Sequence, residues 1–80
     1  MSTFHITIAS VGETYYNGEA LSVSLPGETG IFTILPHHEA FITTLKTGTI
    51  LLNAAGSEKR EYQITGGVVE CANNSVAVLL

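Results

Sequence analysis

Hydrophobic and polar residues alternate over several short stretches of the chain. The clearest alternation lies near the start, where Phe4, Ile6 and Ile8 are separated by His5 and Thr7. The same period of two recurs within residues 20–25, 61–65 and 75–79. Successive side chains of a β-strand point to opposite faces, so each stretch predicts a strand that buries one face. The faces predicted to be buried carry Phe4, Ile6 and Ile8; Leu21, Val23 and Leu25; Tyr62 and Ile64; and Val76 and Val78.

Turn-forming residues separate these stretches at intervals of about ten residues. Asn17-Gly18 is the strongest signal, because both residue types accept the positive φ angles of a two-residue hairpin turn. Further turns or bulges are expected at Pro26-Gly27, Thr47-Gly48, Ala55-Gly56-Ser57, Gly66-Gly67 and Asn73-Asn74.

The strands predicted between these turns cover residues 3–10, 13–17, 20–25, 31–35, 41–45, 48–54, 60–65, 67–72 and 75–79. The nearest candidate for a helix, residues 39–46, contains the β-branched Ile42, Thr43 and Thr44, which favour strands. We therefore predict an all-β fold, an antiparallel β-sandwich or barrel of about nine or ten short strands. The whole chain, residues 1–80, is expected to form this single domain.

The composition is low in charge for a soluble domain. Only 12% of the 80 residues are charged, whereas 45% are hydrophobic. A typical domain carries about twice that charged share. Either another protein covers part of the surface, or hydroxyl-rich strands alone keep the domain soluble. The net charge of −4 disfavours binding to nucleic acid, which requires a basic patch.

The segment ILPHHEAF, residues 34–41, places His37, His38 and Glu39 in a row. Adjacent residues of an extended chain point to opposite sides, so the two histidines do not readily share one metal ion. A small metal- or ligand-binding β-barrel that uses His5, His37 and His38 stays open as an alternative function. A hydrolase that uses Glu39 with a histidine is a third. The pattern itself favours a loop whose histidines contact another protein.

Other candidate sites lack the context that chemistry requires. The sequence GETG at residues 27–30 is not followed by the Gly-Lys-Ser/Thr of a phosphate-binding loop and is interpreted as a tight turn. Cys71 is the single cysteine, and no basic neighbour is present to activate it, so a buried thiol is expected. We therefore expect no catalytic residue, no cofactor and no metal site. This indicates a binding or structural module that is not an enzyme.

The stretch GETGIFTILPHHEAFITTLKTGTI, residues 27–50, resembles the core of the epsilon subunit of rotary (F-type) ATP synthases. The residues that match the family's pattern are Gly27, Gly30, Ile34, Leu35, Pro36, His38, Leu45, Lys46 and Gly48. Residues 4–10, 17–27 and 62–79 resemble the family's first strand, its hairpin with the following strand, and its closing strands. The family has glycine or proline where this chain has Thr33, His37, Ala40 and Thr47, and alanine at Glu39, so these loops are expected to differ.

The resemblance implies a β-sandwich followed by a C-terminal helical hairpin, which would begin where this chain ends at Leu79-Leu80. It implies a non-catalytic rotor subunit of the central stalk, bound to the gamma subunit and the c-ring, that couples proton or sodium transport to ATP synthesis. Such a subunit lies at the cytoplasmic face of the bacterial inner membrane, or its organellar equivalent, and contacts the membrane only through the complex.

The resemblance also assigns two contact surfaces. The residues that match the gamma-facing surface are Ser10, His38, Glu39, Ala40, Phe41, Ile42 and Thr43. The residues that match the ring-facing loop are Glu28, Thr29, Gly30, Ile31 and Phe32.

Overall fold

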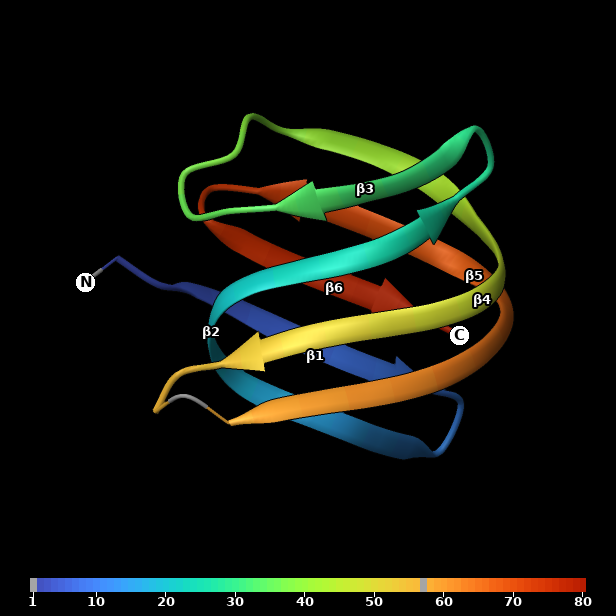
Figure 1. Ribbon diagram of the computed structural model, residues 1–80, viewed down its shortest axis with the longest axis horizontal. Coiled ribbons are helices and arrows are strands. Elements are labelled where there is room, and N and C mark those ends of the chain that lie inside the picture. The colour runs from blue at the N-terminus through green and yellow to red at the C-terminus, as the bar shows by residue number, and fades with distance from the viewer. Residues whose placement is uncertain (1, 57) are drawn as a thin grey trace.

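The computed structural model describes residues 2–56 and 58–80, and their regular structure is all β (Figure 1). The strands are β1 (Phe4–Ser10), β2 (Glu13–Gly27), β3 (Gly30–Ile34), β4 (Phe41–Ala54), β5 (Lys59–Ala72) and β6 (Ser75–Leu79). The all-β prediction is confirmed. Within these residues there is no helix of the length and hydrophobicity that crossing a membrane requires.

The strands form two layers that share long, bent strands. One layer contains β3, the second half of β2, the second half of β4 and the first half of β5. The other contains the first half of β2, then β1, β6, the second half of β5 and the first half of β4. All of these pairings are antiparallel except that of β1 with β6, which is parallel. The predicted antiparallel sandwich is therefore confirmed, with one parallel pair.

The structure describes six strands where the sequence predicted about nine or ten, because β2, β4 and β5 each continue through an expected break. The predicted hairpin turn at Asn17-Gly18 is wrong. Asn17 pairs with Thr7 and Gly18 with Ile6 in an unbroken ladder between β2 and β1. Gly18 leaves room for the Tyr16 side chain, because a Cβ at position 18 would lie 3.2 Å from the hydroxyl oxygen of Tyr16.

The breaks expected at Thr47-Gly48 and Gly66-Gly67 are bends within strands. The β4–β5 ladder runs from Lys46–Gly66 to Gly48–Ile64 without a shift of register. A Cβ at Gly48 would lie 2.7 Å from the Cβ of Pro26, so only glycine allows β2 and β4 to approach this closely. The glycines therefore let the long strands pass from one layer to the other.

Short turns connect β1 to β2, β4 to β5 and β5 to β6. Gly12 has a φ of 81° in the turn between β1 and β2, and Asn73 and Asn74 have φ angles of 53° and 60° between β5 and β6. The turn expected at residues 55–57 is observed at Ala55 and Gly56, and Ser57 lies outside the described residues.

The core lies between the layers and consists of aliphatic residues with Phe4 and Cys71. The predicted inward positions of β1 and β6 are confirmed, because Phe4, Ile6, Ile8, Val76 and Val78 are buried. In β2 the alternation changes phase at a bulge between Ala20 and Ser22. Ala20, Val23 and Leu25 are consequently buried, whereas Leu21, which was predicted to share their face, is partly exposed.

Candidate functional site

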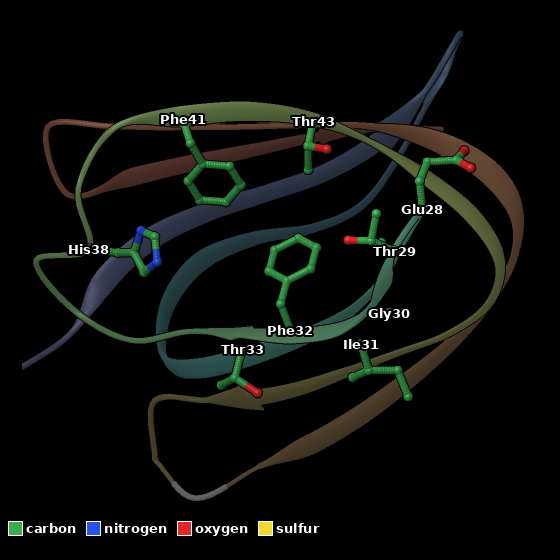
Figure 2. A pocket seen from close by; sticks show the side chains of 10 residues that line it. Glu28, Thr29, Gly30, Ile31, Phe32, Thr33, His38, Phe41 and Thr43 are labelled. Carbon is green, nitrogen blue, oxygen red and sulfur yellow. The ribbon is translucent and has the colours of Figure 1, made fainter.

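A cleft opens on one flank of the sandwich, where the two layers separate. It lies between β3 and the first half of β4, and it is closed at one end by the pairing of Gly27 with Leu45. Its volume is about 380 Å³, and residues 27–33 line it together with His38, Phe41 and Thr43 (Figure 2). We call it the flank cleft.

Aromatic rings form the floor of the flank cleft. Phe32 of β3 and Phe41 of β4 point toward one another from opposite walls (Figure 2), with ring centroids 5.7 Å apart in an edge-to-face arrangement. The imidazole of His38 packs on the other side of Phe41 at 5.0 Å. A Cβ at Gly27 would lie 2.8 Å from the Phe32 ring, so glycine is required here for the ring to fold over the chain. Such aromatic pairs stabilise the folded protein by more than the burial of their apolar area alone provides.

The loop of residues 35–40, which carries both histidines, is fixed by the turn between β5 and β6. The backbone N–H of His37, a residue with a φ of 66°, donates to Oδ1 of Asn74 at 2.7 Å. Nδ2 of Asn74 donates to the carbonyl of Thr3 at 2.9 Å, and the Asn74 carbonyl accepts from the N–H of His5 at 3.2 Å. One asparagine therefore joins three segments that lie far apart in the sequence.

Both contact surfaces that the sequence predicted meet at the flank cleft. All five residues of the predicted ring-facing set, Glu28 to Phe32, line the cleft. The predicted gamma-facing set contributes His38, Phe41 and Thr43. Glu39 and Ala40 are exposed in the adjacent loop. Ile31 and Ile42, one from each predicted set, are 80% and 67% exposed. Phe32 and Phe41 are partly buried, because their rings also pack against the core.

Ser10 does not join this cluster. It ends β1, and its hydroxyl lies 3.2 Å from the hydroxyl of Tyr15. Both residues line a second cleft on the other flank, together with Tyr62 and Leu80. The structure therefore separates Ser10 from the other residues that were predicted to face gamma.

The outer faces of the two layers differ in polarity. Around Ile42, the outer face of β4, β5 and β6 carries the exposed Val68 and Leu79, and Ile42 is paired with Glu70. The outer face of the other layer is polar, with lateral hydrogen bonds between the hydroxyls of Ser24 and Thr33 and from Asn53 to Ser22. The sequence analysis missed Val68 and Leu79. The available signals are the pairs Val68-Val69 and Val78-Leu79, since two consecutive apolar residues place one on each face of a strand.

The described residues include no group of three or more His, Cys or Glu side chains that could hold a metal ion. His5 lies in β1, His38 is packed on Phe41 with its Nδ1 2.8 Å from the Glu39 carbonyl, and His37 is exposed. Cys71 is buried as expected, and its burial raises the pKa of the thiol, which opposes formation of a nucleophilic thiolate. The chemistry that this arrangement supports is apolar contact.

Comparison with known proteins gives a consistent result. Residues 3–80 match the family described as the ATP synthase delta/epsilon chain, beta-sandwich domain. Two relatives named ATP synthase epsilon chain, from Delftia acidovorans and Bordetella avium, are each 37% identical over 79 residues. These matches cover 99% of this chain but only 57% and 56% of the relatives, so the chain spans little more than half of their length.

Solved structures share the fold at lower identity. A chain of the Euglena gracilis mitochondrial ATP synthase OSCP/F1/c-ring assembly superposes with a TM-score of 0.90 at 18% identity, over 99% of this chain and 51% of that one. A chain of the Tetrahymena thermophila mitochondrial ATP synthase central stalk/c-ring assembly gives a TM-score of 0.80 at 16% identity, over 94% of this chain and 60% of that one. At such identities the likeness establishes the fold alone.

Proposed function

Because this chain belongs to the family of ATP synthase delta/epsilon chain β-sandwich domains, we propose that it is a non-catalytic part of the central stalk of an ATP synthase. It binds the gamma subunit and the c-ring and turns with them, so that ion flow through the membrane is coupled to ATP synthesis. Its place is peripheral, at the cytoplasmic face of a bacterial inner membrane, and it contacts the membrane only through the complex.

The observation that carries this proposal is the convergence, on one side of the sandwich, of two segments that each carry exposed or half-buried apolar side chains. Residues 28–32 and 38–43 come from different strands, and both border the flank cleft. The exposed Ile42 continues this surface onto the outer face that also carries Val68 and Leu79. An apolar centre with polar residues around it is the usual composition of a stable protein interface.

We assign gamma to the face around Ile42 and the c-ring to the tip of the β2–β3 turn, at Glu28 and Thr29. The turn tip is exposed and lies at one end of the sandwich (Figure 1). The apolar outer face is broader and suits an extensive, permanent contact, because obligate interfaces are larger and more hydrophobic than transient ones. Ser10, on the other flank, would contact gamma only if that subunit reached around β1.

Co-purification with the gamma subunit of the same organism tests the assignment. Ile42→Asp is the test variant, because the side chain is 67% exposed and its loss removes nothing from the core. Burying an unpaired carboxylate at an interface is expected to weaken binding about 10- to 100-fold. Phe41→Asp would be less clear, since the Phe41 ring also packs against the core.

Leu51→Asp is the matched control. Leu51 is also on β4 and 49% exposed, but it lies on the polar outer face of the other layer. Both substitutions place the new aspartate directly opposite a glutamate, Glu70 for residue 42 and Glu61 for residue 51. Their effects on folding should therefore be similar. Retention of gamma by Leu51→Asp and its loss from Ile42→Asp is the expected result; equal retention by the two variants would refute the assignment of this face.

A further inference from the structure

The two flanks of the sandwich differ in how their strand edges are protected. Among the residues that the structure describes, each layer ends in an edge strand on each flank, because β3 pairs with β2 alone, and residues 41–44 of β4 pair with β5 alone. On the other flank the edges are the start of β2, which pairs with β1, and the start of β5, which pairs with β4.

The second flank carries the protection that exposed edges normally have. Its two edges contain five charged residues: Glu13, Glu19, Lys59, Arg60 and Glu61. Side chains also cross it, since the rings of Tyr15 and Tyr62 lie 6.3 Å apart and the Arg60 guanidinium lies 5.2 Å from the centre of the Tyr16 ring. Charges on an edge strand oppose pairing with another polypeptide.

The edges of the flank cleft also have rings that meet across them, those of Phe32 and Phe41, but they lack charged residues. The sequences GIFTI of β3 and FITTL of β4 contain no charged residue and no proline. They are rich in β-branched and aromatic residues, which favour strand pairing. An uncharged edge of this kind on a free surface invites aggregation, and a strand of a binding partner is one of the elements that can cover it.

The backbone of β3 has pairing groups that face outward. Ile31 lies opposite Pro26. Proline has no N–H, so this pair cannot exchange the two hydrogen bonds of a bonded antiparallel pair. Ile31 and Pro26 therefore form a non-hydrogen-bonded pair, in which the N–H and C=O of Ile31 point away from β2. Thr33 lies two residues further along β3, so its N–H and C=O point the same way. In this register Ile31 and Thr33 offer their backbone groups along the open edge.

We propose that an extended segment of the gamma subunit pairs with the free edge of β3, adding a strand to the sandwich at the flank cleft. This rests on the proposed function and specifies how that partner binds. Alternate side chains of the added strand pack on Phe32, Phe41 and His38, where the cleft has room for them. Backbone hydrogen bonds give such an interaction its affinity, and side-chain pockets give it specificity.

The charges at the cleft specify the partner strand further. Glu28 lies at one end of the edge and Glu39 near the other, whereas the chain's three basic residues, Lys46, Lys59 and Arg60, do not line the cleft. A partner strand with an uncharged centre and a lysine or arginine at the end near Glu39 complements this arrangement, while Glu28 at the turn tip remains assigned to the c-ring. Gamma is the proposed occupant because the cleft beside β3 is also lined by His38 and Phe41, which the resemblance assigns to the gamma-facing surface. The proposal therefore transfers Ile31 and Phe32 from the ring-facing set to gamma and leaves the turn tip to the c-ring.

Proline substitution separates backbone pairing from side-chain contact. Ile31→Pro removes the outward N–H but no bond to β2, and Ile31→Ala keeps the N–H and removes most of the side chain. The affinity of each variant for the purified gamma subunit is measured by calorimetry. We expect Ile31→Pro to bind about 10- to 100-fold more weakly than Ile31→Ala, because the partner carbonyl loses its donor. Similar affinities of the two variants would overturn the added strand.

Amide hydrogen exchange gives a second readout that does not depend on a variant. In the free protein the amides of Ile31 and Thr33 should exchange faster than those of Phe32 and Ile34. In the complex with gamma, Ile31 and Thr33 should become protected. If the complex forms and these two amides stay unprotected, the added strand is refuted but the proposed function stands. If no complex with gamma forms at all, the proposed function fails as well.

Discussion

Replacing Asn74 by glycine tests whether one side chain fixes the histidine loop. Asn74 has a φ of 60°, and its side chain accepts from the N–H of His37 and donates to the carbonyl of Thr3. Glycine adopts this backbone conformation without strain, so Asn74→Gly removes the two hydrogen bonds and leaves the turn geometry possible. Any loss of stability then reports the hydrogen bonds and the added flexibility of glycine.

The expected loss is about 1–3 kcal/mol in the free energy of unfolding, since each hydrogen bond contributes about 0.5–1.5 kcal/mol net. In a domain of this size, 1 kcal/mol corresponds to about 4–8 °C in Tm. Asn74→Ala should lose about 1–2 kcal/mol more than Asn74→Gly, because a Cβ is unfavourable in the left-handed region. The three proteins should therefore rank as wild type, then glycine, then alanine.

Asn73→Gly is the control, because Asn73 is its neighbour in the turn, has a φ of 53° and is exposed. It should change stability by less than about 0.5 kcal/mol. Urea denaturation with a common slope measures the differences, and hydrogen exchange should show faster exchange at the His37 amide of Asn74→Gly. Equal losses for the two glycine variants would show that the Asn74 side chain does not hold the loop.

Two further predictions concern packing and the buried thiol. Gly48→Ala should destabilise the domain by about 1–3 kcal/mol in urea denaturation, because the new Cβ meets Pro26 at 2.7 Å, and Gly66→Ala, with its nearest atom at 3.7 Å, should be close to neutral. Burial raises the pKa of Cys71 above its ordinary value of 9.0, so above that pH the unfolded chain loses the thiol proton first. The stability of the wild type relative to Cys71→Ala should then be constant at neutral pH and fall above pH 9.0; a rise there would contradict the reasoning.

The sequence was sufficient for the strands whose pattern is set locally. Phe4, Ile6 and Ile8 alternate without interruption, and both their strand and their buried face were predicted correctly. The Asn17-Gly18 turn failed because turn propensity is a local preference, whereas the ladder with β1 is formed by residues about ten positions away. Gly48 was recognised as an irregularity, but its reason, the approach of Pro26, is a tertiary contact that no local pattern contains.

Some features of the candidate site could likewise be predicted from the sequence, and others depend on tertiary structure. The resemblance assigned Ile31, Phe32, Phe41 and Ile42 to contact surfaces. Ile31 and Ile42 are exposed, whereas Phe32 and Phe41 are partly buried. The meeting of residues 28–32 with residues 38–43 in one cleft depends on how the layers separate, and it was not predictable. Nor was the role of Asn74, since an asparagine in an Asn-Asn turn is expected for its backbone conformation alone. The identity of the partners at each surface stays a prediction.

In the proposed role, the domain has to carry force between the ring contact and the gamma contact without deforming. The turn tip at Glu28 and Thr29 continues directly into Gly27, which pairs with Leu45 of β4. Ile42 lies three residues along the same strand. The two contacts are thus joined by one strand pair rather than by a loop, and their relative positions are fixed by backbone hydrogen bonds. The Phe32–Phe41 contact spans the flank cleft beside this path, so opening the cleft would also disrupt the aromatic packing. An added strand on β3 would stiffen this side further, because it would pair an open edge next to the Gly27–Leu45 connection.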